Sequence, residues 1–259
     1  MSSDVLVWAG VALLGLAIGS FLNVVIYRLP RMLEAQWAAD MDESPSVHPT
    51  AEEAASISKL APAKPFNIAF PGSHCPHCGH VLSWAENLPV LSYLWLKGRC
   101  RQCQSPIGWR YPAIELLSAV LFLWIFSQNG LSPSFLAWAG FAAALVALAA
   151  IDADTRLLPD AITQPLVWSG LLAASFGLTQ ISLLTALWCA AGGYLFLWSV
   201  YWLFKLITGK EGMGQGDFKL LAALGAWFGW QALPGIVLLS SVVGAVVGIG
   251  LLVLARRGR

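Results

Sequence analysis

Three long stretches without a charged side chain constrain this chain more than any other feature of its sequence. Residues 116–151, 161–204 and 220–255 contain no Asp, Glu, Lys or Arg. Each is much longer than the ~20 apolar residues that cross the hydrocarbon layer of a membrane once. Over the whole chain 58% of residues are hydrophobic and 11% are charged, against roughly 25% charged in a soluble domain. The sequence therefore predicts an all-α polytopic membrane protein.

Polar breaks divide these stretches into seven predicted spans. The breaks read SQNGLSPS, GLTQ and QALPG, and a further apolar segment lies near the N-terminus. The predicted spans are residues 4–27, 112–128, 133–151, 160–177, 181–206, 217–231 and 235–255. An eight-span alternative splits the long fifth segment at Gly192 and Gly193. The first segment opens with Asp4 and lacks a small-residue cleavage site, which favours an uncleaved signal anchor over a signal peptide.

The distribution of basic residues predicts the orientation of these spans. Short loops rich in Lys and Arg stay on the cytoplasmic side of a membrane. In the seven-span arrangement, the basic residues near span ends all fall on one side: Arg28, Arg31, Arg110, Arg156, Lys205, Lys210, Lys219, Arg256, Arg257 and Arg259. We therefore expect an external N-terminus and a cytoplasmic C-terminus.

The one sizeable polar region, residues 28–111, is then cytoplasmic and has two parts. Residues 34–65 are rich in Ala, Ser, Pro and acidic side chains, with few large apolar groups. Such a composition buries too little surface to offset its ordering entropy, so we expect a mobile or weakly helical insertion. Residues 66–111 carry four of the five cysteines, in the two sequences CPHC and CRQC.

The paired cysteines predict a small zinc-ribbon-like domain after the first helix. Two Cys-x-x-Cys pairs are typical of zinc knuckles, in which each pair supplies two thiolates to one tetrahedral ion. The predicted ligands are Cys75, Cys78, Cys100 and Cys103. Thiol redox chemistry at CPHC is an alternative, but it belongs on a thioredoxin-like fold that this region does not supply. A disulfide does not suit a reducing compartment.

The remaining candidate metal ligands have simpler interpretations. His74, His77 and His80 crowd the first knuckle, but four cysteines already satisfy a tetrahedral ion. We expect these histidines to be solvated or to support the ligands. The fifth cysteine, Cys189, lies within the fifth predicted span and is expected to be a small packing residue.

Carboxylates at span ends are the candidate catalytic groups, because an ionisable group at a membrane is costly and usually functional. Asp217 lies at the start of the sixth span, and Asp152, Asp154 and Asp160 lie around the junction of the third and fourth spans. If the third helix continues through this junction, Asp152 and Asp154 point about 200° apart. Asp152 directly follows the apolar run and is expected to be the more buried of the two. Asp160 follows Pro159 and fits an acid in the first turn of a helix.

The glycine-rich segment GKEGMGQGDFKLLAALGAWFGW, residues 209–230, surrounds Asp217. Glycines free the backbone for positive φ angles or for close approach by another segment. A phosphate-binding loop is disfavoured, because the Gly-Lys-Ser/Thr ending is missing and a membrane span precedes the segment. An ordinary loop with Asp217 as the helix N-cap is the other alternative.

Two carboxylates that meet at a membrane surface indicate one chemistry above others. Close carboxylates do not both ionise easily, so one holds a proton while the other acts as a general base. Such a pair can activate water and polarise a peptide carbonyl, which hydrolyses an amide without a covalent intermediate. A membrane scaffold or a cation transporter is the alternative class, but the repeated halves typical of transporters are not seen in this sequence.

Five blocks of the sequence resemble the bifunctional type IV prepilin peptidases and N-methyltransferases of bacterial inner membranes. The blocks are GSFLNVVIYRLP at 19–30, CPHCGHVLSWAENLPVLSYLWLKGRCRQC at 75–103, RYPAIELLSA at 110–119, IDADTRLLPD at 151–160 and the glycine-rich segment at 209–230. The resemblance implies a GxGD aspartic protease, distantly similar in motif to presenilin. Its first catalytic aspartate is then Asp152 and its second Asp217, with Gly214 and Gly216 as the supporting glycines.

The same resemblance implies the substrates and the second activity. Members cut the short basic leader from prepilins and pseudopilins of type IV pilus and type II secretion systems. They then methylate the new N-terminal amine, usually of phenylalanine, with S-adenosylmethionine. The resemblance assigns methylation broadly to the cysteine-bearing domain, where Glu86, Asn87 and Arg101 are candidate contributors, although Glu86 and Asn87 could instead cap a local helix. No nucleic-acid partner is expected.

These interpretations predict three domains. They are an N-terminal transmembrane helix over 1–27, a cytoplasmic domain over 28–111, and a six-helix membrane protease domain over 112–259.

Overall fold

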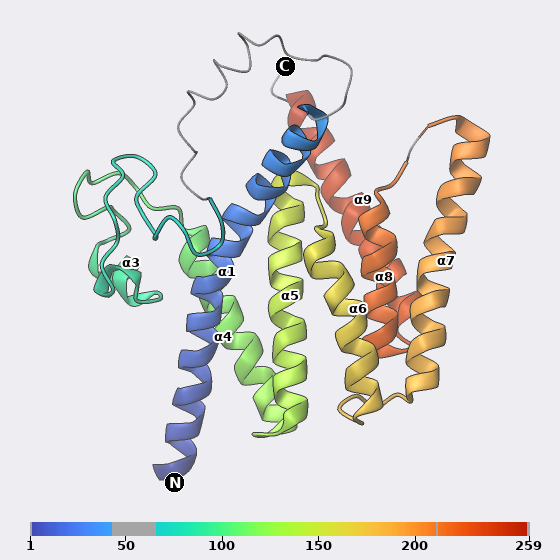
Figure 1. Ribbon diagram of the computed structural model, residues 1–259, viewed down its shortest axis with the longest axis horizontal. Helices are drawn as coiled ribbons and strands as arrows, with labels where there is room; N and C mark the ends of the chain where they lie inside the picture. The colour runs from blue at the N-terminus through green and yellow to red at the C-terminus, as the bar shows by residue number, and fades with distance from the viewer. Residues whose placement is uncertain (1, 43–65, 211, 258–259) are drawn as a thin grey trace, which may run out of the picture. The chain divides into compact units, whose positions relative to one another are not determined.

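The computed structural model describes residues 2–42, 66–210 and 212–257, and the described part is dominated by seven long helices (Figure 1). Their bounds are α1 Ser2–Asp42, α4 Arg110–Asn129, α5 Pro133–Thr155, α6 Asp160–Ser175, α7 Leu183–Thr208, α8 Gln215–Phe228 and α9 Leu233–Arg257. Between α1 and α4 lie a short 3-10 helix, η1 (Ala85–Asn87), and a five-residue helix, α3 (Leu91–Trp95). The predicted all-α class is confirmed.

Each of the seven predicted spans overlaps one long helix. The fifth segment forms α7 without interruption at Gly192 and Gly193, so the helix break required by the eight-span alternative is not found. Five helices, α1, α4, α5, α7 and α9, are long and apolar enough to cross a membrane. The other two, α6 with 16 residues and α8 with 14, are shorter than the ~20 residues of a full crossing. The count of seven spans stays a prediction.

The first helix is longer than the sequence pattern predicts. The apolar segment was expected to end near residue 27, but α1 continues through Pro30 to Asp42. The expected insertion over 34–65 therefore begins with an ordered helical turn, because residues 34–42 belong to α1. The rest of that insertion, residues 43–65, lies outside the described part of the chain.

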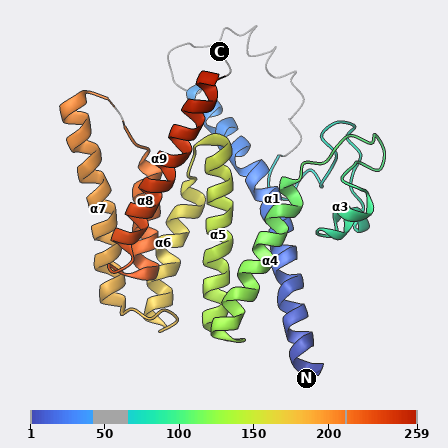
Figure 2. The ribbon, with the colours of Figure 1, turned by 180° about the vertical axis from the view of Figure 1, so that it is seen from behind.

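The helices form two compact units, Met1–Leu157 and Leu158–Arg259. In the first unit α1, α4 and α5 lie side by side, as both ribbon views show (Figures 1 and 2). A Cβ atom added at Gly15 would lie 2.6 Å from Ala119 Cα, and one at Gly19 would lie 2.6 Å from Glu115 Cα. The close approach of α1 to α4 thus depends on glycine at both positions.

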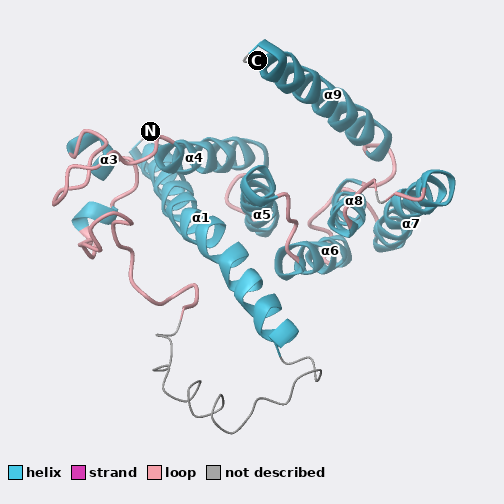
Figure 3. Ribbon diagram, turned by 90° about the horizontal axis from the view of Figure 1, so that it is seen from above, coloured by secondary structure: helices cyan, strands magenta, loops and turns pink. Residues whose placement is uncertain are grey.

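In the second unit α6 and α7 pack on α8 (Figure 3). Gly193 of α7 lies against the carbonyl of Leu221, so small residues bring these two backbones together. Trp227 Nε1 donates a hydrogen bond to the Leu166 carbonyl across the contact with α6. Cys189 is buried in α7, which confirms its predicted role in packing.

Candidate active site and metal centre

The first predicted catalytic aspartate lies in the last turn of α5. The helix continues through the IDADT segment to Thr155, as the sequence analysis required, and so Asp152 and Asp154 leave it in different directions. Arg156 ends the helix with a left-handed φ of 55°, and its N–H donates to the Asp152 carbonyl over 2.8 Å. This turn gives the Asp152 backbone a defined position.

Hydrogen-bond partners distinguish the two aspartates of this turn, whereas burial does not. Both side chains are exposed, so the expectation that Asp152 is the more buried one stays a prediction. Asp154 is engaged by Arg110, the first residue of α4, whose Nη1 lies 2.5 Å from each carboxylate oxygen. Arg110 Nη2 also donates to the Ala150 carbonyl over 2.8 Å. Among the described residues the Asp152 carboxylate has no such partner, which leaves it available for chemistry.

The second predicted catalytic aspartate lies in the first turn of α8. Gly214 is the N-cap of this helix, and the Asp217 N–H donates to the Gly214 carbonyl over 3.3 Å. The alternative in which Asp217 itself is the N-cap is therefore wrong. Its partly buried carboxylate lies at the positive end of the α8 dipole, a position that favours negative charge.

The two glycines of the GQGD sequence differ in their surroundings. A Cβ atom added at Gly216 would lie 2.6 Å from Leu158 Cβ, and no real side chain fits there without a shift. One added at Gly214 would lie 3.7 Å from Asp217 Oδ2, an ordinary contact. Gly216 therefore allows the close approach of α8 to the segment before α6.

A second ion pair supports this approach. Lys219 Nζ, one turn into α8, lies 2.6 Å from each carboxylate oxygen of Asp160. Asp160 opens α6 directly after Pro159, which confirms its predicted position in the first turn of a helix. Asp152 belongs to the first unit and Asp217 to the second, so their pairing across one water stays a prediction.

The four paired cysteines converge, as the two knuckles predicted. Their four Sγ atoms lie within 4.8 Å of one another, and none of them forms a disulfide. The Cys75–Cys103 and Cys78–Cys100 sulfur distances are 3.8 and 3.9 Å. A tetrahedral ion with bonds of ~2.3 Å has ligand atoms about 3.8 Å apart, so the cluster fits such an ion.

The two knuckles repeat one backbone pattern. In the first, Gly79 N–H donates to the Cys75 carbonyl and Cys75 N–H to the His80 carbonyl. In the second knuckle, the Gln104 N–H donates to the Cys100 carbonyl in the same way. The backbone N–H groups of Cys78 and His77 lower the pKa of the Cys75 thiol to about 6. The thiolate of Cys75, the form that binds metal, is thus favoured near neutral pH.

Glu86 is a buried carboxylate that organises the loop after the first knuckle. It accepts hydrogen bonds from the backbone N–H and the hydroxyl of Ser83, both over 2.8 Å. His80 Nε2 lies 3.3 Å from the same carboxylate. The Ser83 N–H and hydroxyl are the largest influences that lower the Glu86 pKa to about 2. Glu86 is therefore a fixed negative charge. The alternative in which Glu86 and Asn87 cap the following helix is wrong, because Val90 is the N-cap of α3 and no side chain caps that helix.

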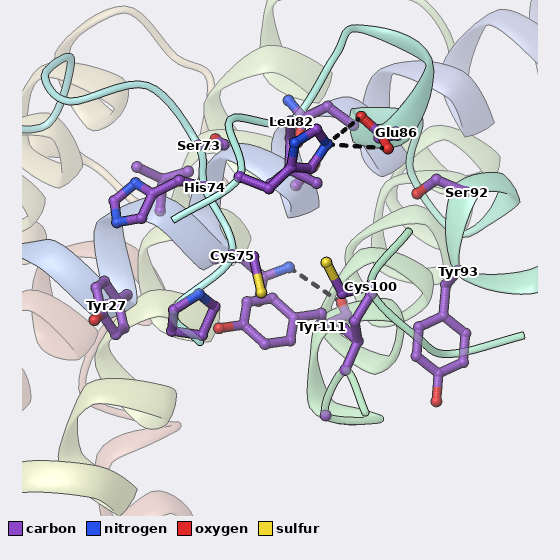
Figure 4. A pocket seen from close by; sticks show the side chains of 18 of the residues that line it. Tyr27, Ser73, His74, Cys75, Leu82, Glu86, Ser92, Tyr93, Cys100 and Tyr111 are labelled. Atoms are coloured by element: carbon purple, nitrogen blue, oxygen red, sulfur yellow. Dashed lines mark hydrogen bonds and ion pairs between the residues drawn. The ribbon is translucent and has the colours of Figure 1, made fainter. Parts of the chain in front are cut away.

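A cavity of about 320 Å³ lies between α1, the knuckles and the start of α4, all within the first unit. Tyr27, Tyr111 and Glu86 surround it in Figure 4. Its lining includes all three residues that the sequence analysis offered for methylation: Glu86, Asn87 and Arg101. Asn87 and Arg101 are exposed, whereas Glu86 is buried. Glu86, Asn87 and Arg101 therefore line the same cavity. The family resemblance assigned methylation only broadly to the cysteine-bearing domain.

The cavity is also lined by polar residues that the sequence did not predict to belong to a site. Arg28 is buried and donates to the carbonyls of Asn67, Ile68, Pro71 and Gly72, which ties the segment before the first knuckle to α1. Asn23 Nδ2 donates to the Tyr111 carbonyl over 3.1 Å. Glu115 lines the cavity from α4. Their sequence context could have identified Asn23, Arg28 and Glu115, because each is a polar residue that interrupts an apolar helical segment.

Comparison with known protein families and relatives gives consistent matches along the chain. Residues 13–129 match the bacterial peptidase A24 N-terminal domain, and residues 139–249 match the type IV leader peptidase family. A prepilin leader peptidase/N-methyltransferase of Aeromonas hydrophila is 53% identical over 94% of this chain and 81% of its own length. Proteins of the same name from Burkholderia pseudomallei and Pseudomonas aeruginosa are 51% and 49% identical, over 95% and 92% of this chain and 76% and 78% of their own lengths.

No solved structure matches this chain significantly. Two adjoining family models account for most of its length, and relatives of about half identity cover nearly all of it. The chain belongs to the type IV leader peptidase family.

Proposed function

We propose that this protein is a membrane aspartic endopeptidase that removes the leader peptide of type IV prepilins and pseudopilins and then N-methylates the new N-terminal residue. The observation that carries the proposal is the pair Asp152 and Asp217, which both lie in the region that matches the type IV leader peptidase family. Asp152 and Asp217 each lie in a terminal helical turn whose residue two positions further on forms an ion pair. The family membership favours this activity over a scaffold or a transporter.

In the proposed hydrolysis, Asp152 and Asp217 share one proton. The ionised carboxylate takes a proton from water as the water attacks the scissile carbonyl carbon, and the protonated one donates a hydrogen bond to the carbonyl oxygen. The nitrogen of the leaving segment then receives a proton, and the peptide C–N bond breaks. The neighbouring Asp154 and Asp160 do not fit this role, because Arg110 and Lys219 already occupy them.

The substrates approach this site from the membrane. A prepilin has a short basic leader followed by an apolar helix, so its cleavage point lies at the lipid surface. The basic residues at one set of span ends support a cytoplasmic position for that surface, for the cysteine-bearing domain and for the C-terminus. We place the protein in the bacterial inner membrane on these grounds, with the domains over 1–27, 28–111 and 112–259 as the functional parts.

Zinc is the proposed occupant of the cysteine cluster. Four thiolates in a tetrahedral arrangement leave no open position for a reacting water, which is typical of a structural site. The sulfur spacing of 3.8 to 3.9 Å supports this assignment. The ion would link the two knuckles and so stabilise the walls of the neighbouring cavity.

The cavity is the proposed site of methyl transfer. Its volume of about 320 Å³ is at the lower end of the ~300–1,000 Å³ typical of small-molecule sites. Aromatic rings and the Glu86 carboxylate line it, and both attract a cation such as the sulfonium of S-adenosylmethionine. When bound, that cofactor supplies an electrophilic methyl group. Glu86 provides a fixed negative charge in the wall, and Asn87 and Arg101 provide hydrogen-bond donors at its rim.

Conservative variants of the two aspartates test whether cleavage and methylation use separate sites. Asp152→Asn and Asp217→Asn keep the side-chain shape but remove the shared proton, so cleavage of a purified prepilin should fall by at least ~100-fold. Mass spectrometry of an already trimmed pilin, incubated with either variant and S-adenosylmethionine, should still show the gain of one methyl group. Loss of methylation together with cleavage in folded variants would contradict separate sites.

A further inference from the structure

Glu115 is a carboxylate within a membrane helix that the proposed peptidase chemistry does not use. It lies six residues into α4 if Arg110 counts as the first, and its side chain is 8% exposed. It lines the cavity described above. Its Oε2 accepts a hydrogen bond from the Val90 N–H over 2.7 Å, and the Ser20 side chain is a second hydrogen-bond partner. Both of these partners are neutral.

No basic side chain in the described part of the chain pairs with Glu115. Three arginines line the cavity wall. Arg28 donates to four loop carbonyls, Arg31 donates to the Tyr27 carbonyl over 2.6 Å, and Arg101 is exposed on the second knuckle. A buried carboxylate without a counter-charge is costly, and in a membrane helix it usually marks a functional site. The cavity is therefore suited to a ligand that brings its own positive charge.

The two carboxylates of the cavity are not equivalent. Glu86 lies on the knuckle side and already accepts hydrogen bonds from both Ser83 donors, with His80 beside it. Glu115 lies on the side of the membrane helices, where its Cα packs against Gly19 of α1. A ligand whose charged end is attached to an apolar peptide would reach Glu115 from the membrane. A polar cofactor would enter from the knuckle side.

Resting on the methyltransferase function proposed above, we propose that Glu115 binds the α-amine of the trimmed pilin and takes a proton from it. An ammonium group can donate hydrogen bonds to a carboxylate, whereas a sulfonium has no hydrogen to donate. Once a proton has moved from nitrogen to Glu115, the nitrogen has a free lone pair. That pair forms the new nitrogen–carbon bond while the carbon–sulfur bond of the donor breaks and its electrons remain on sulfur. The product is a methylammonium and a neutral thioether, and Glu115 returns its proton to water.

Glu115→Gln separates this role from a structural one. The glutamine amide oxygen can still accept the Val90 N–H, so the link between the knuckle domain and α4 is kept. The negative charge and the proton acceptor are lost. Glu34→Gln is the matched control, because Glu34 is an exposed carboxylate on α1 that does not line the cavity.

Four measurements on the full-length protein in lipid nanodiscs make the test. They are prepilin cleavage, binding of tritiated S-adenosylmethionine, N-methylation of a trimmed pilin, and binding of a synthetic mature pilin N-terminal peptide with a free or acetylated amine. For Glu115→Gln we expect cleavage and donor binding within about twofold of wild type and methylation slower by at least ~100-fold. The wild type should bind the free amine more tightly than the acetylated peptide, and Glu115→Gln should lose this preference.

Other results overturn the proposal or separate it from the methyltransferase function. Wild-type methylation by Glu115→Gln would overturn it, and so would joint loss of donor binding and methylation, which assigns the carboxylate to the donor or to the fold. Equal binding of free and acetylated peptides by the wild type would overturn it without any variant. The wild type could transfer no methyl group and yet bind the free amine more tightly than the acetylated peptide, with this preference lost in Glu115→Gln. That result would reject the methyltransferase function but keep Glu115 as an amine-binding site.

Discussion

At the scale of single residues, the knuckle domain depends on polar side chains whose partners come from nearby in the sequence. Glu86 is the clearest case, because a buried carboxylate is stable only when donors surround it. Ser83, three residues earlier, supplies two of its donors, and His80 lies beside it. The donors from Ser83, and then His80, lower the Glu86 pKa from its usual value of 4.5 to about 2.

The Glu86 carboxylate should make the stability of the folded protein decrease at low pH. Its folded pKa of about 2 lies below the ordinary value of 4.5, so its contribution is complete above about pH 4.5 and is lost as the pH falls towards 2. Glu86→Gln should therefore lower the unfolding temperature at pH 7. Thermal unfolding of both proteins across pH should show that this difference shrinks below about pH 4.5. A difference that is independent of pH would contradict the assignment.

At the scale of secondary-structure elements, each candidate catalytic turn is tied to the beginning of another helix. Arg110 at the start of α4 holds the end of α5, and Asp160 at the start of α6 holds the start of α8. Exposed ion pairs contribute little to stability, typically about 0.2–1 kcal/mol. Their importance here is geometric, because a small misplacement of a catalytic group can cost much of its rate.

Loss of the Arg110 contact should affect catalysis more than stability. Arg110→Ala removes the hydrogen bonds to Asp154 and Ala150, and we expect kcat for prepilin cleavage to fall by about tenfold with little change in KM. Its unfolding temperature should change little. Asp154→Asn keeps a hydrogen-bond acceptor for Arg110 and should retain most activity. Complete inactivity of Asp154→Asn would instead identify Asp154 as the catalytic residue.

The packing of α8 predicts unequal effects for the two glycines before Asp217. Gly216→Ala places a methyl group against Leu158 and must displace α8, so cleavage should fall by at least about tenfold. Gly214→Ala meets only an ordinary contact and should lose less activity. Initial rates of prepilin cleavage, measured beside the unfolding temperature of each variant, distinguish the two. Equal losses of activity in the two variants would show that the close contact with Leu158 is not the reason for glycine at position 216.

At the scale of the whole molecule, the proposed activities lie in different environments. The cavity proposed for methylation lies entirely within the first compact unit, between the knuckles and the helices α1 and α4. The proposed peptidase site requires Asp152 from this unit and Asp217 from the other. Damage to the knuckles should therefore affect methylation first.

Removal of the proposed zinc tests this separation. Purified protein should contain about one zinc per chain, and Cys75→Ser with Cys100→Ser should abolish it, because both buried thiols are lost. We expect methylation of trimmed pilin to disappear and prepilin cleavage to persist. Metal analysis and the two product masses give the result. Unchanged methylation in a metal-free variant would show that the cavity does not depend on the ion.

The sequence alone was sufficient for features that follow from local pattern. Charge-free stretches predicted seven helices, since burial in lipid demands long apolar runs with their backbone hydrogen bonds satisfied internally. The spacing of CPHC and CRQC predicted the convergence of four sulfurs, because zinc knuckles repeat one short backbone pattern. The order and spacing of five sequence blocks, among them IDADTRLLPD and the segment that contains GQGD, were enough to indicate the family.

Tertiary structure decided what depends on contacts between distant segments. No local pattern shows that Arg110 occupies Asp154, because 44 positions separate them. The apolar run before Asp152 did not show that both aspartates of the last turn of α5 are exposed. The cavity, and with it the position of Glu115 opposite the knuckles, exists only because α1 and α4 approach at Gly15 and Gly19 and carry the knuckle domain between them. Pattern determines which segments become helices, but the packing of side chains determines which polar groups meet.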